Sequence, residues 1–209
     1  MIEIKVKNYM VSEFGTNCYF VINSRTKEML VVDPGDNAPM LADAITQEEL
    51  IPVGILLTHG HLDHAGAAEA LAKKFGIKIY AHEAEKKTLE DSCINLTSAF
   101  GAPNTFHADV FLKDDEILEL LGCKIKVLFT PGHTPGGCCY YFSEQRMLFS
   151  GDTLFCESVG RTDFPGGSSS VLIRSIREKL LTLPDDVKVY PGHMSQTSIG
   201  TEKMYNPFI

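Results

Sequence analysis

The feature that most constrains this 209-residue chain is a cluster of ionisable side chains at residues 59–64. His59, His61, Asp63 and His64 lie between the apolar segment G-I-L-L-T and the alanine-rich segment A-G-A-A-E-A-L-A. A strand that ends directly before a helix places the connecting loop at a sheet edge, where a rigid scaffold positions its side chains. The fold must therefore accommodate a dense polar loop between two apolar elements.

Five apolar, β-branched segments end in polar turns, and they predict five strands that run into loops. These segments span residues 29–36, 54–61, 126–133, 147–152 and 187–193. Pro-Gly or Ser-Gly pairs in four of them stop the strand and turn the backbone. The tripeptide Pro-Gly-His occurs at residues 131–133 and 191–193, which suggests a duplicated half-unit.

Helical periodicity lies between these strands. Residues 67–75 and 172–180 each place apolar side chains on one helical face, and a weaker helix is predicted over residues 39–50. Gly76 is the expected end of the first helix, and the serines at 168–170 are the expected N-terminal cap of the second. Strands that alternate with helices indicate the α/β (α+β) class with layered packing.

The organisation of the chain predicts one domain over residues 1–209. The length is sufficient for one buried core, and no linker or low-complexity segment interrupts the pattern. Residues 91–109 lack periodicity and predict a long loop, which in a compact domain often covers a site.

The charge balance argues against nucleic acid and anionic membranes as partners, since 19 Lys+Arg oppose 27 Asp+Glu. The N-terminal segment M-I-E-I-K-V-K-N alternates charge and apolarity and does not resemble a signal peptide. The apolar runs are shorter than a membrane span. We therefore expect a cytoplasmic protein with a small-molecule substrate, and the oligomeric state stays open.

Histidine nitrogen and aspartate oxygen are preferred ligands of zinc and related divalent metals. His59 and His61 are two residues apart in an extended segment, so both rings point to the same side and can bind one ion. Asp63 and His64, at the turn into the next helix, can reach a second ion. Four groups do not complete two coordination shells, so further ligands are expected from other loops.

Three residues at other strand ends can complete the site, namely His133, Asp152 and His193. An aspartate can bridge two ions about 3.5–4 Å apart through its two oxygens, and Asp152 is the bridging candidate. His82 and His107 lack a comparable context, so they are predicted to be packing or surface residues.

At these residues a family resemblance is plain. T-H-G-H-L-D-H resembles the H-x-H-x-D-H signature of the metallo-β-lactamase-fold hydrolases, and T-P-G-H-T, S-G-D-T and Y-P-G-H resemble later motifs of that family. These motifs cover most of the chain. The resemblance implies a four-layered αββα sandwich with metal ions at one edge of the two sheets.

The resemblance also implies two ligand groups that share a bridging carboxylate: His59, His61 and His133 for the first ion, Asp63, His64 and His193 for the second, and Asp152 between them. Two divalent ions are expected, with zinc as the first choice and iron or manganese also acceptable to such ligands. A hydroxide between the ions would attack a carbonyl carbon at neutral pH. Asp63 is predicted to be catalytic as well as a ligand.

Within this family the chain most resembles glyoxalase II, the hydroxyacylglutathione hydrolases, especially their short bacterial relatives. The resemblance includes G-D-T-L-F-C-E-S-V-G-R-T-D-F-P-G-G, residues 151–167, and a C-terminal N-P-F. Full-length glyoxalase II has a further helical region whose basic residues bind glutathione, and we expect no counterpart of this region here. The resemblance predicts a thioester substrate. The thiol carrier stays open, because the glutathione-binding region is not expected.

Other family branches fit less well or stay open as alternatives. Asp152 argues against the metallo-β-lactamases proper, which have cysteine or serine there. A persulfide dioxygenase with one iron held by two histidines and an aspartate resembles the G-R-T-D-F region. A metal-binding module without turnover is the non-enzymatic alternative.

Arg161 and Asp163 lie in this G-R-T-D-F segment and are the candidate substrate-binding residues. The planar guanidinium of Arg161 could bind a substrate carboxylate. The pair could instead orient ligands or fix the turn as a local salt bridge.

Overall fold

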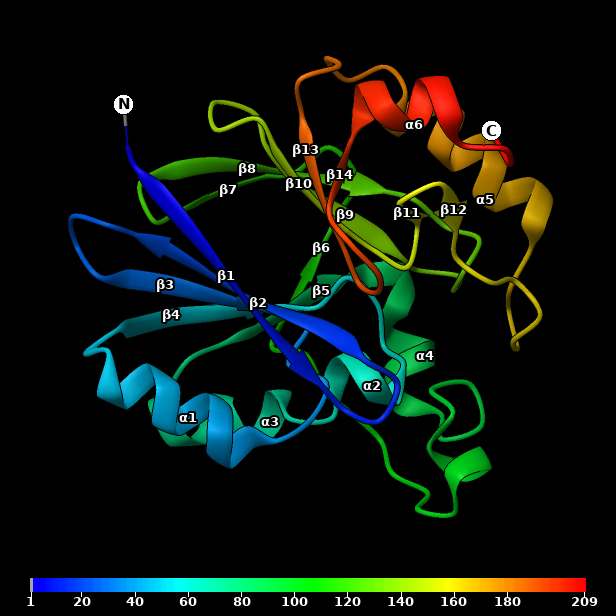
Figure 1. Ribbon diagram of the computed structural model, residues 1–209. Coiled ribbons are helices and arrows are strands. Elements are labelled where there is room, and N and C mark those ends of the chain that lie inside the picture. The colour runs from blue at the N-terminus through cyan, green and yellow to red at the C-terminus, as the bar shows by residue number, and fades with distance from the viewer. Residues whose placement is uncertain (1) are drawn as a thin grey trace.

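The computed structural model describes residues 2–209 and contains two six-stranded sheets that pack face to face (Figure 1). The first sheet has the strand order β1 (Ile4–Val11), β2 (Thr16–Asn23), β3 (Glu28–Val32), β4 (Ile51–Leu56), β5 (Ile79–His82) and β6 (Val110–Leu112). Strands β1 to β3 are antiparallel, and β3 to β6 are parallel.

The second sheet also contains both antiparallel and parallel strand pairs. Its strands, in chain order, are β7 (Ile117–Leu120), β8 (Cys123–Phe129), β9 (Cys138–Phe142), β10 (Met147–Gly151), β13 (Lys188–Pro191) and β14 (Thr197–Ser198). Only the β10–β13 pair is parallel among the described strands of this sheet. A short hairpin of β11 (Leu154–Phe155) and β12 (Ser158–Val159) follows β10.

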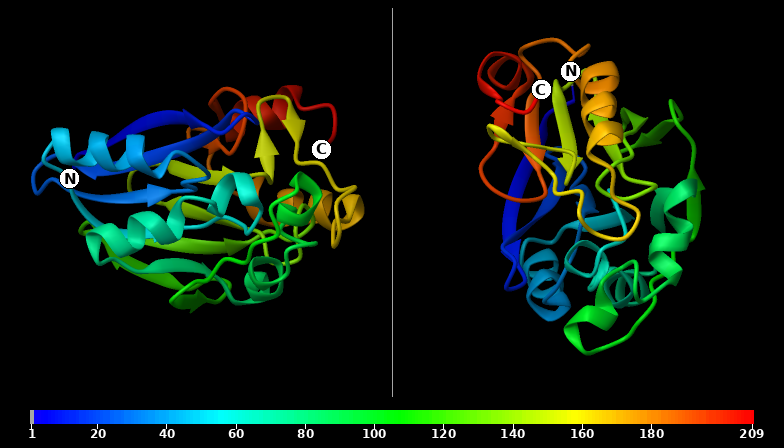
Figure 2. Two further views of the ribbon diagram at one scale, coloured as in Figure 1. Left: turned by 90° about the horizontal axis from the view of Figure 1, so that it is seen from below. Right: turned by 90° about the vertical axis from the view of Figure 1, so that its right-hand side faces the viewer.

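Helices cover the outer faces of both sheets (Figure 2). The first sheet carries α1 (Ala38–Gln47) and α3 (Ala68–Phe75), and the second carries α5 (Ser169–Ser175), its π-helical continuation η3 (Ile176–Leu180) and α6 (Ile199–Tyr205). Shorter elements lie near the loops: α2 (Leu62–Ala65), η1 (Glu83–Glu85), α4 (Lys86–Glu90) and η2 (Thr97–Phe100). The α/β class and the four-layered αββα arrangement are confirmed.

Alternating side chains of the strands build three apolar cores. Phe20 of β2 packs toward α1 and α3, whereas its neighbour Val21 packs between the sheets. In the same way, Cys138 packs in the core between the sheets, and Cys139 packs in the core under α5. Because each sheet is covered on both faces, its central strands are apolar throughout, which explains the continuous hydrophobic segments.

The predicted elements are present, with three differences. The helix over residues 172–180 ends as the π-helix η3. Ser168 occupies the N-cap position of α5 as predicted, but its side chain makes no capping bond. The hydroxyl of Ser168 lies 3.4 Å from that of Ser170 instead. The two Pro-Gly-His tripeptides both follow strands of the second sheet, so they do not mark two halves.

Within residues 2–209, none of the helices has both the length and the apolar character needed to cross a bilayer. The assignment of residues 1–209 to one domain stays a prediction.

Candidate metal centre

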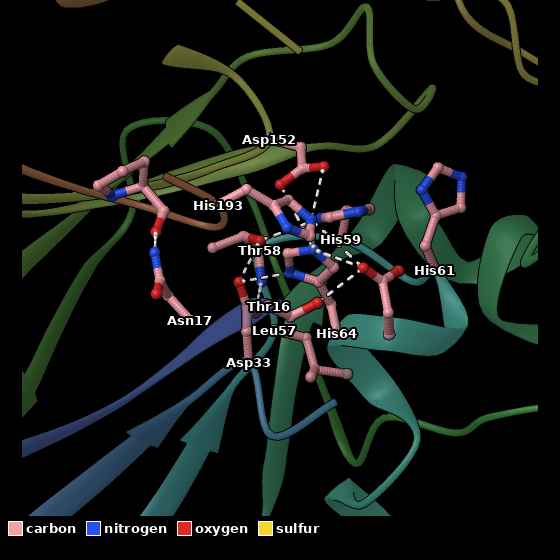
Figure 3. A network of polar contacts seen from close by, with 12 residues as sticks. Thr16, Asn17, Asp33, Leu57, Thr58, His59, His61, His64, Asp152 and His193 are labelled. Carbon is pink, nitrogen blue, oxygen red and sulfur yellow. Dashed lines mark hydrogen bonds and ion pairs between the residues drawn. The ribbon is translucent and has the colours of Figure 1, made fainter. Parts of the chain in front are cut away.

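The seven predicted ligands lie together at one end of the two sheets. Figure 3 shows His59, His61, His64, Asp152 and His193 of this set. The first sheet supplies four of them from the loop after β4 and from α2, and the second sheet supplies one after each of β8, β10 and β13. Their nitrogen and oxygen atoms form three groups, each within 4.8 Å: His59, His61 and His133; His59, His64 and Asp152; Asp63, His64 and His193.

Asp152 lies between the two outer groups. Its Oδ2 is 3.5 Å from His133 Nε2 and 3.5 Å from His193 Nε2, and its Oδ1 is 3.3 Å from His64 Nε2. One carboxylate thus faces histidines from both groups. This is the position that a bridging ligand requires.

The first group is buried and electrically neutral. His61 Nδ1 lies 3.0 Å from His133 Nε2. Burial, with the neighbouring His64 and His133, holds the pKa of His59 well below its usual value, and burial with His133 does the same for the pKa of His61. Neutral imidazoles keep the lone pair that a metal ligand needs.

The second group is more exposed and contains a carboxylate. Asp63 Oδ2 is 3.3 Å from His193 Nε2 and 3.5 Å from His64 Nε2. Burial alone would raise the pKa of Asp63, but the charge of His64 and hydrogen bonds to His193 and Thr16 lower it below its usual value. Asp63 is therefore ionised, as a ligand must be.

Two observations show that this donor set fits divalent cations. His59 Nε2 and Asp152 Oδ1 are buried and have no hydrogen-bond partner among the described residues, which is costly unless a cation satisfies them. Burial alone would lower the pKa of His64, but the carboxylates of Asp152, Asp63 and Asp33 raise it to about 10. Bound cations would neutralise this negative field.

Hydrogen bonds fix the tautomers of three histidines. The Thr58 hydroxyl donates to Asp33 Oδ2 at 2.7 Å, so its oxygen is free to accept from His59 Nδ1 at 3.1 Å. Asp33 Oδ2 also accepts from His64 Nδ1 at 3.0 Å. The Arg161 carbonyl accepts from His133 Nδ1 at 2.7 Å. Each bond places a proton on Nδ1 and directs Nε2 into the site, where the lone pair of the neutral imidazole would bind a cation.

Asp33 is a functional residue that the sequence analysis missed. It follows β3 in the left-handed region (φ 50°) and accepts a third bond from the Thr58 backbone N–H at 2.8 Å. This carboxylate therefore connects the ends of β3 and β4 to His64. The available signal was its position, since it directly precedes a Pro-Gly turn at a strand end.

Residues of β2 hold the second group. The Thr16 hydroxyl donates to Asp63 Oδ2 at 2.8 Å. The Asn17 amide donates to the carbonyls of Pro191 at 3.0 Å and Met194 at 2.9 Å, on either side of His193. The antiparallel β1–β2 pair of the first sheet thus positions a turn of the second sheet.

Glu85 connects the two sheets in the same way beside the first group. Its Oε1 accepts from the Gly60 N–H at 2.8 Å, and its Oε2 accepts from the Thr134 hydroxyl at 3.0 Å and the Gly136 N–H at 2.7 Å. Burial raises the pKa of Glu85 to about 7, although these hydrogen bonds lower it. Gly60 separates His59 from His61, and Thr134 follows His133, so Glu85 joins both ligand loops.

The two Pro-Gly-His glycines are required for different reasons. Gly132 has φ +136° and lies against the backbone of Leu172, where a Cβ would be 2.3 Å from the amide nitrogen. A Cβ at Gly192 would lie 2.3 Å from Asp152 Oδ1 and 2.6 Å from His64 Cε1. Gly192 therefore allows the backbone to approach the site closely, in addition to allowing the sharp turn that the sequence predicts.

A pocket of about 410 Å³ opens onto the site. Its floor includes five of the seven side chains: His61, Asp63, His133, Asp152 and His193. Its walls are mostly apolar and include Phe155, Val159 and Phe164. A small substrate bound there would contact the predicted ligands directly.

The long segment over residues 91–109 contributes to this pocket. It contains η2, and Leu96 and Phe100 line the pocket wall. The expectation that this segment lies over a site is confirmed for these two residues. Closure of the segment as a lid stays a prediction.

Only one member of the predicted substrate-binding pair lines the pocket. The described lining residues include Arg161 but not Asp163. The two side chains form an exposed bidentate ion pair with N–O distances of 2.7 and 2.6 Å, and the Arg161 guanidinium lies 4.0 Å from the Phe164 ring centroid. The arrangement supports the salt-bridge alternative, while the Arg161 backbone orients His133.

The two remaining histidines are outside this centre, as expected. His82 is buried and stacks on Phe129 with ring centroids 4.3 Å apart. His107 is exposed, and its backbone N–H donates to Glu69 at 3.0 Å. The prediction of packing and surface roles for these residues is confirmed.

Comparison with known proteins identifies the class. The family model of the metallo-beta-lactamase superfamily matches residues 11–193. Hydroxyacylglutathione hydrolase GloC of Haemophilus influenzae is 42% identical over 205 residues, which cover 95% of this chain and 95% of that protein. The chain thus belongs to the metallo-beta-lactamase superfamily, and its similarity is to a short, single-domain metallo-hydrolase.

Two solved structures share this fold along nearly the whole chain. The BLEG-1 B3 metallo-beta-lactamase is 40% identical with a TM-score of 0.93, and the alignment covers 98% of this chain and 99% of that one. TTHA1623 in a di-iron-bound form is 33% identical with a TM-score of 0.86 and covers 97% and 100%. Membership of the superfamily implies a divalent-metal site, and TTHA1623 shows that a relative binds iron.

Proposed function

We propose that this protein is a metal-dependent hydrolase that cleaves a thioester of the hydroxyacyl-thiol type. The similarity to the hydroxyacylglutathione hydrolase GloC supports this reaction class. The proposed cofactor is a pair of divalent ions, with zinc as the first candidate and iron or manganese as the alternatives.

The observation that carries the proposal is the position of Asp152 between the two groups of side chains. His59, His61 and His133 would hold one ion, Asp63, His64 and His193 the other, and Asp152 both. Bound divalent ions supply water that loses its proton near neutral pH and a positive charge that polarises a carbonyl group.

The chain itself supplies orientation and a dry pocket. Asp33, Thr58 and the Arg161 carbonyl keep three imidazoles in the tautomer that directs Nε2 inward. Thr16 fixes Asp63 at the pocket floor, where the carboxylate faces a bound substrate and would act in the reaction. The apolar walls limit water around the reacting carbonyl group, which strengthens electrostatic interactions there.

The test combines metal analysis with hydrolysis. Protein purified without added metal is analysed for zinc, iron and manganese, then depleted with a chelator and reloaded with each ion separately. We expect up to two ions per chain, and thioester hydrolysis that disappears on depletion and returns on reloading. A fully loaded protein that hydrolyses no acyl thioester of any tested thiol would contradict the proposal.

A second candidate reaction is β-lactam hydrolysis, because the BLEG-1 protein is described as a B3 metallo-beta-lactamase and is 40% identical to this chain. The same reloaded protein is therefore assayed with a chromogenic cephalosporin. Oxygen uptake with a thiol persulfide tests the dioxygenase alternative, for which the iron-loaded form is used. Binding of metal without any of these activities would support the non-catalytic module.

The proposed setting of this activity is a single domain in the cytoplasm that acts on a small molecule. No nucleic-acid or membrane partner is proposed, because the net charge is −8. The oligomeric state stays open.

A further inference from the structure

One side of the pocket is an apolar wall built from three segments that are distant in the sequence. This apolar wall consists of Phe14, Leu96, Phe100 and Met194. Phe14 lies in the turn between β1 and β2, Leu96 and Phe100 belong to the long segment around η2, and Met194 follows a predicted ligand. The rings of Phe14 and Phe100 meet edge to face, with centroids 5.0 Å apart.

Three members of the wall are unusually exposed for apolar side chains. Phe14 is 46% exposed, Phe100 56% and Met194 60%. Single exposed apolar residues are common, but several gathered at one pocket mouth are typical of a binding surface. The exposure of these three side chains at the pocket mouth therefore favours an apolar ligand that covers them.

The backbone is held in place at two residues of the wall. Leu96 and Met194 both have positive φ angles, 72° and 67°, which residues with a side chain rarely adopt. Beside Leu96, the buried Asn95 amide donates to the carbonyls of Leu89 at 3.1 Å and Asn104 at 2.9 Å. The Met194 carbonyl is bound by the Asn17 amide.

Backbone conformations of this kind persist where the surrounding structure imposes them, and they cluster at ligand sites. The bonds from Asn95 and Asn17 impose them at two places on the wall. The backbone at Leu96 and Met194 is therefore set before a ligand binds.

The pocket offers little to a charged ligand outside the predicted metal ligands. Among the described lining residues, Arg161 is the only lysine or arginine. Asp163 binds it bidentately, and Phe164 covers one face of the guanidinium. A substrate carboxylate would therefore meet a guanidinium whose charge is already balanced by Asp163. The net charge of −8 further disfavours anionic substrates.

We infer that the substrate is a thioester whose uncharged acyl group carries an apolar chain that lies against the apolar wall, and whose thiol carrier has no free carboxylate. The inference rests on the proposed function and narrows it. In the reaction, the oxygen of water forms a bond to the acyl carbon, the carbon–sulfur bond breaks, and a proton from water goes to the sulfur. A carboxylic acid and a neutral thiol are released.

The test uses acetyl, butyryl and hexanoyl thioesters of N-acetylcysteamine, which is a neutral thiol, and the same acyl groups on glutathione. With metal-loaded protein, we expect kcat/KM to rise about fourfold for each methylene that reaches the wall, which is the gain from burying one methylene. We expect each N-acetylcysteamine thioester to react with a higher kcat/KM than its glutathione counterpart.

The variant Phe100→Ala measures the contribution of the wall. We expect the hexanoyl-to-acetyl ratio of kcat/KM to fall at least fourfold in this variant. The control is Ile117→Ala on the edge strand β7, since Ile117 is 55% exposed and lies outside the lining residues. This control should keep the wild-type ratio and metal content.

The outcomes separate the two levels of the proposal. Hydrolysis that is independent of acyl length, or faster with glutathione as the carrier, overturns this inference and leaves the proposed function intact. An unchanged ratio in Phe100→Ala also overturns it. Failure to hydrolyse this acyl series while hydroxyacyl thioesters react overturns the inference alone. Absence of all thioester hydrolysis by the metal-loaded wild type, hydroxyacyl thioesters included, overturns the proposed function and this inference together.

Discussion

The two sheets contribute to the metal centre in opposite ways. The first sheet supplies four of the seven side chains from one continuous stretch, residues 59–64. The second sheet supplies His133, Asp152 and His193, one after each of β8, β10 and β13. A local cluster thus gives half of each proposed ion site. Three separate strand ends of the second sheet supply the other half.

Contacts between the sheets hold the side chains of the first sheet and those of the second in position relative to one another. Glu85 joins the loop after β4 to the loop after β8, and Asn17 joins β2 to the turn after β13. Neither residue is close in sequence to a predicted ligand. The comparison teaches that the dense cluster identifies the site, whereas isolated polar residues of the first sheet place the ligands of the second.

The largest effect is expected for Asp152→Ala. This substitution removes the one side chain that faces both groups, so metal content should fall below one ion per chain. The hydrolysis rate should fall by more than about 100-fold, the upper range for residues that only orient ligands. Metal analysis and kcat/KM after reloading measure both effects.

The matched variant for this comparison is His61→Ala. His61 belongs to one group, so we expect loss of one ion and retention of the other. Unchanged metal occupancy and rate in Asp152→Ala would contradict its bridging position. Equal stoichiometries for the two variants would contradict the difference between a shared and an unshared ligand.

A smaller effect is expected for Glu85→Gln. The amide group of glutamine replaces one acceptor oxygen with a donor, opposite the N–H groups of Gly60 and Gly136 or the Thr134 hydroxyl. Metal affinity and kcat should fall about 10- to 100-fold, as for other residues that orient ligands. The control is Glu83→Gln, an exposed neighbour in η1 that should match the wild type.

A spectroscopic measurement separates positioning from a purely structural role. Cobalt substituted into the site reports ligand geometry through its visible spectrum. An altered spectrum at full occupancy in Glu85→Gln supports positioning. A wild-type spectrum and affinity, with only a lower melting temperature, would show that Glu85 stabilises the fold alone.

The pH dependence of stability tests the environment of Glu85 in a second way. Burial raises the pKa of Glu85 from 4.5 to about 7 in the folded protein. The folded state therefore holds the extra proton between these values, and the free energy of unfolding falls as the pH rises through this window. Glutamine does not titrate, so the wild type should lose stability relative to Glu85→Gln between about pH 5 and pH 8.

Urea unfolding of chelator-treated protein at these two pH values measures this difference. The ionisable ligands are common to both proteins, so their contribution cancels to first order in the comparison. A wild type that gains stability relative to the variant at the higher pH would contradict the raised pKa.

The smallest effect is expected for Asp163→Asn. The ion pair with Arg161 is exposed, and exposed pairs contribute little to stability. His133 is oriented by the backbone carbonyl of Arg161, which the substitution retains. Metal content and melting temperature should therefore stay close to wild type, and a loss of metal would show that the ion pair controls the ligand loop.

Much of the fold was predictable because it depends on local patterns. Five strands end in turns where the apolar segments meet polar residues, and α3 ends at Gly76 in the left-handed conformation. Ser168 is at the predicted N-cap position, but its side chain contacts Ser170 and leaves the backbone N–H groups of α5 without the expected bond. Local preference for serine at a helix start does not fix its rotamer.

Residues that orient the ligands were not predictable in the same way. Asp33, Glu85 and Thr16 are single polar residues whose partners lie 25 to 51 positions away. Single polar residues are common on any surface, and only burial beside a ligand loop distinguishes them. Their role depends on contacts that no sequence period encodes.

The sequence by itself determined the chemistry of this protein, because histidine and aspartate at strand ends specify the donor atoms and the residues at which they are attached. The tertiary structure decided which of these atoms face each other, which tautomer each imidazole adopts, and where the apolar wall lies. These properties arise when separate strand ends are brought to one edge of two packed sheets, since hydrogen bonds and burial depend on distance in space.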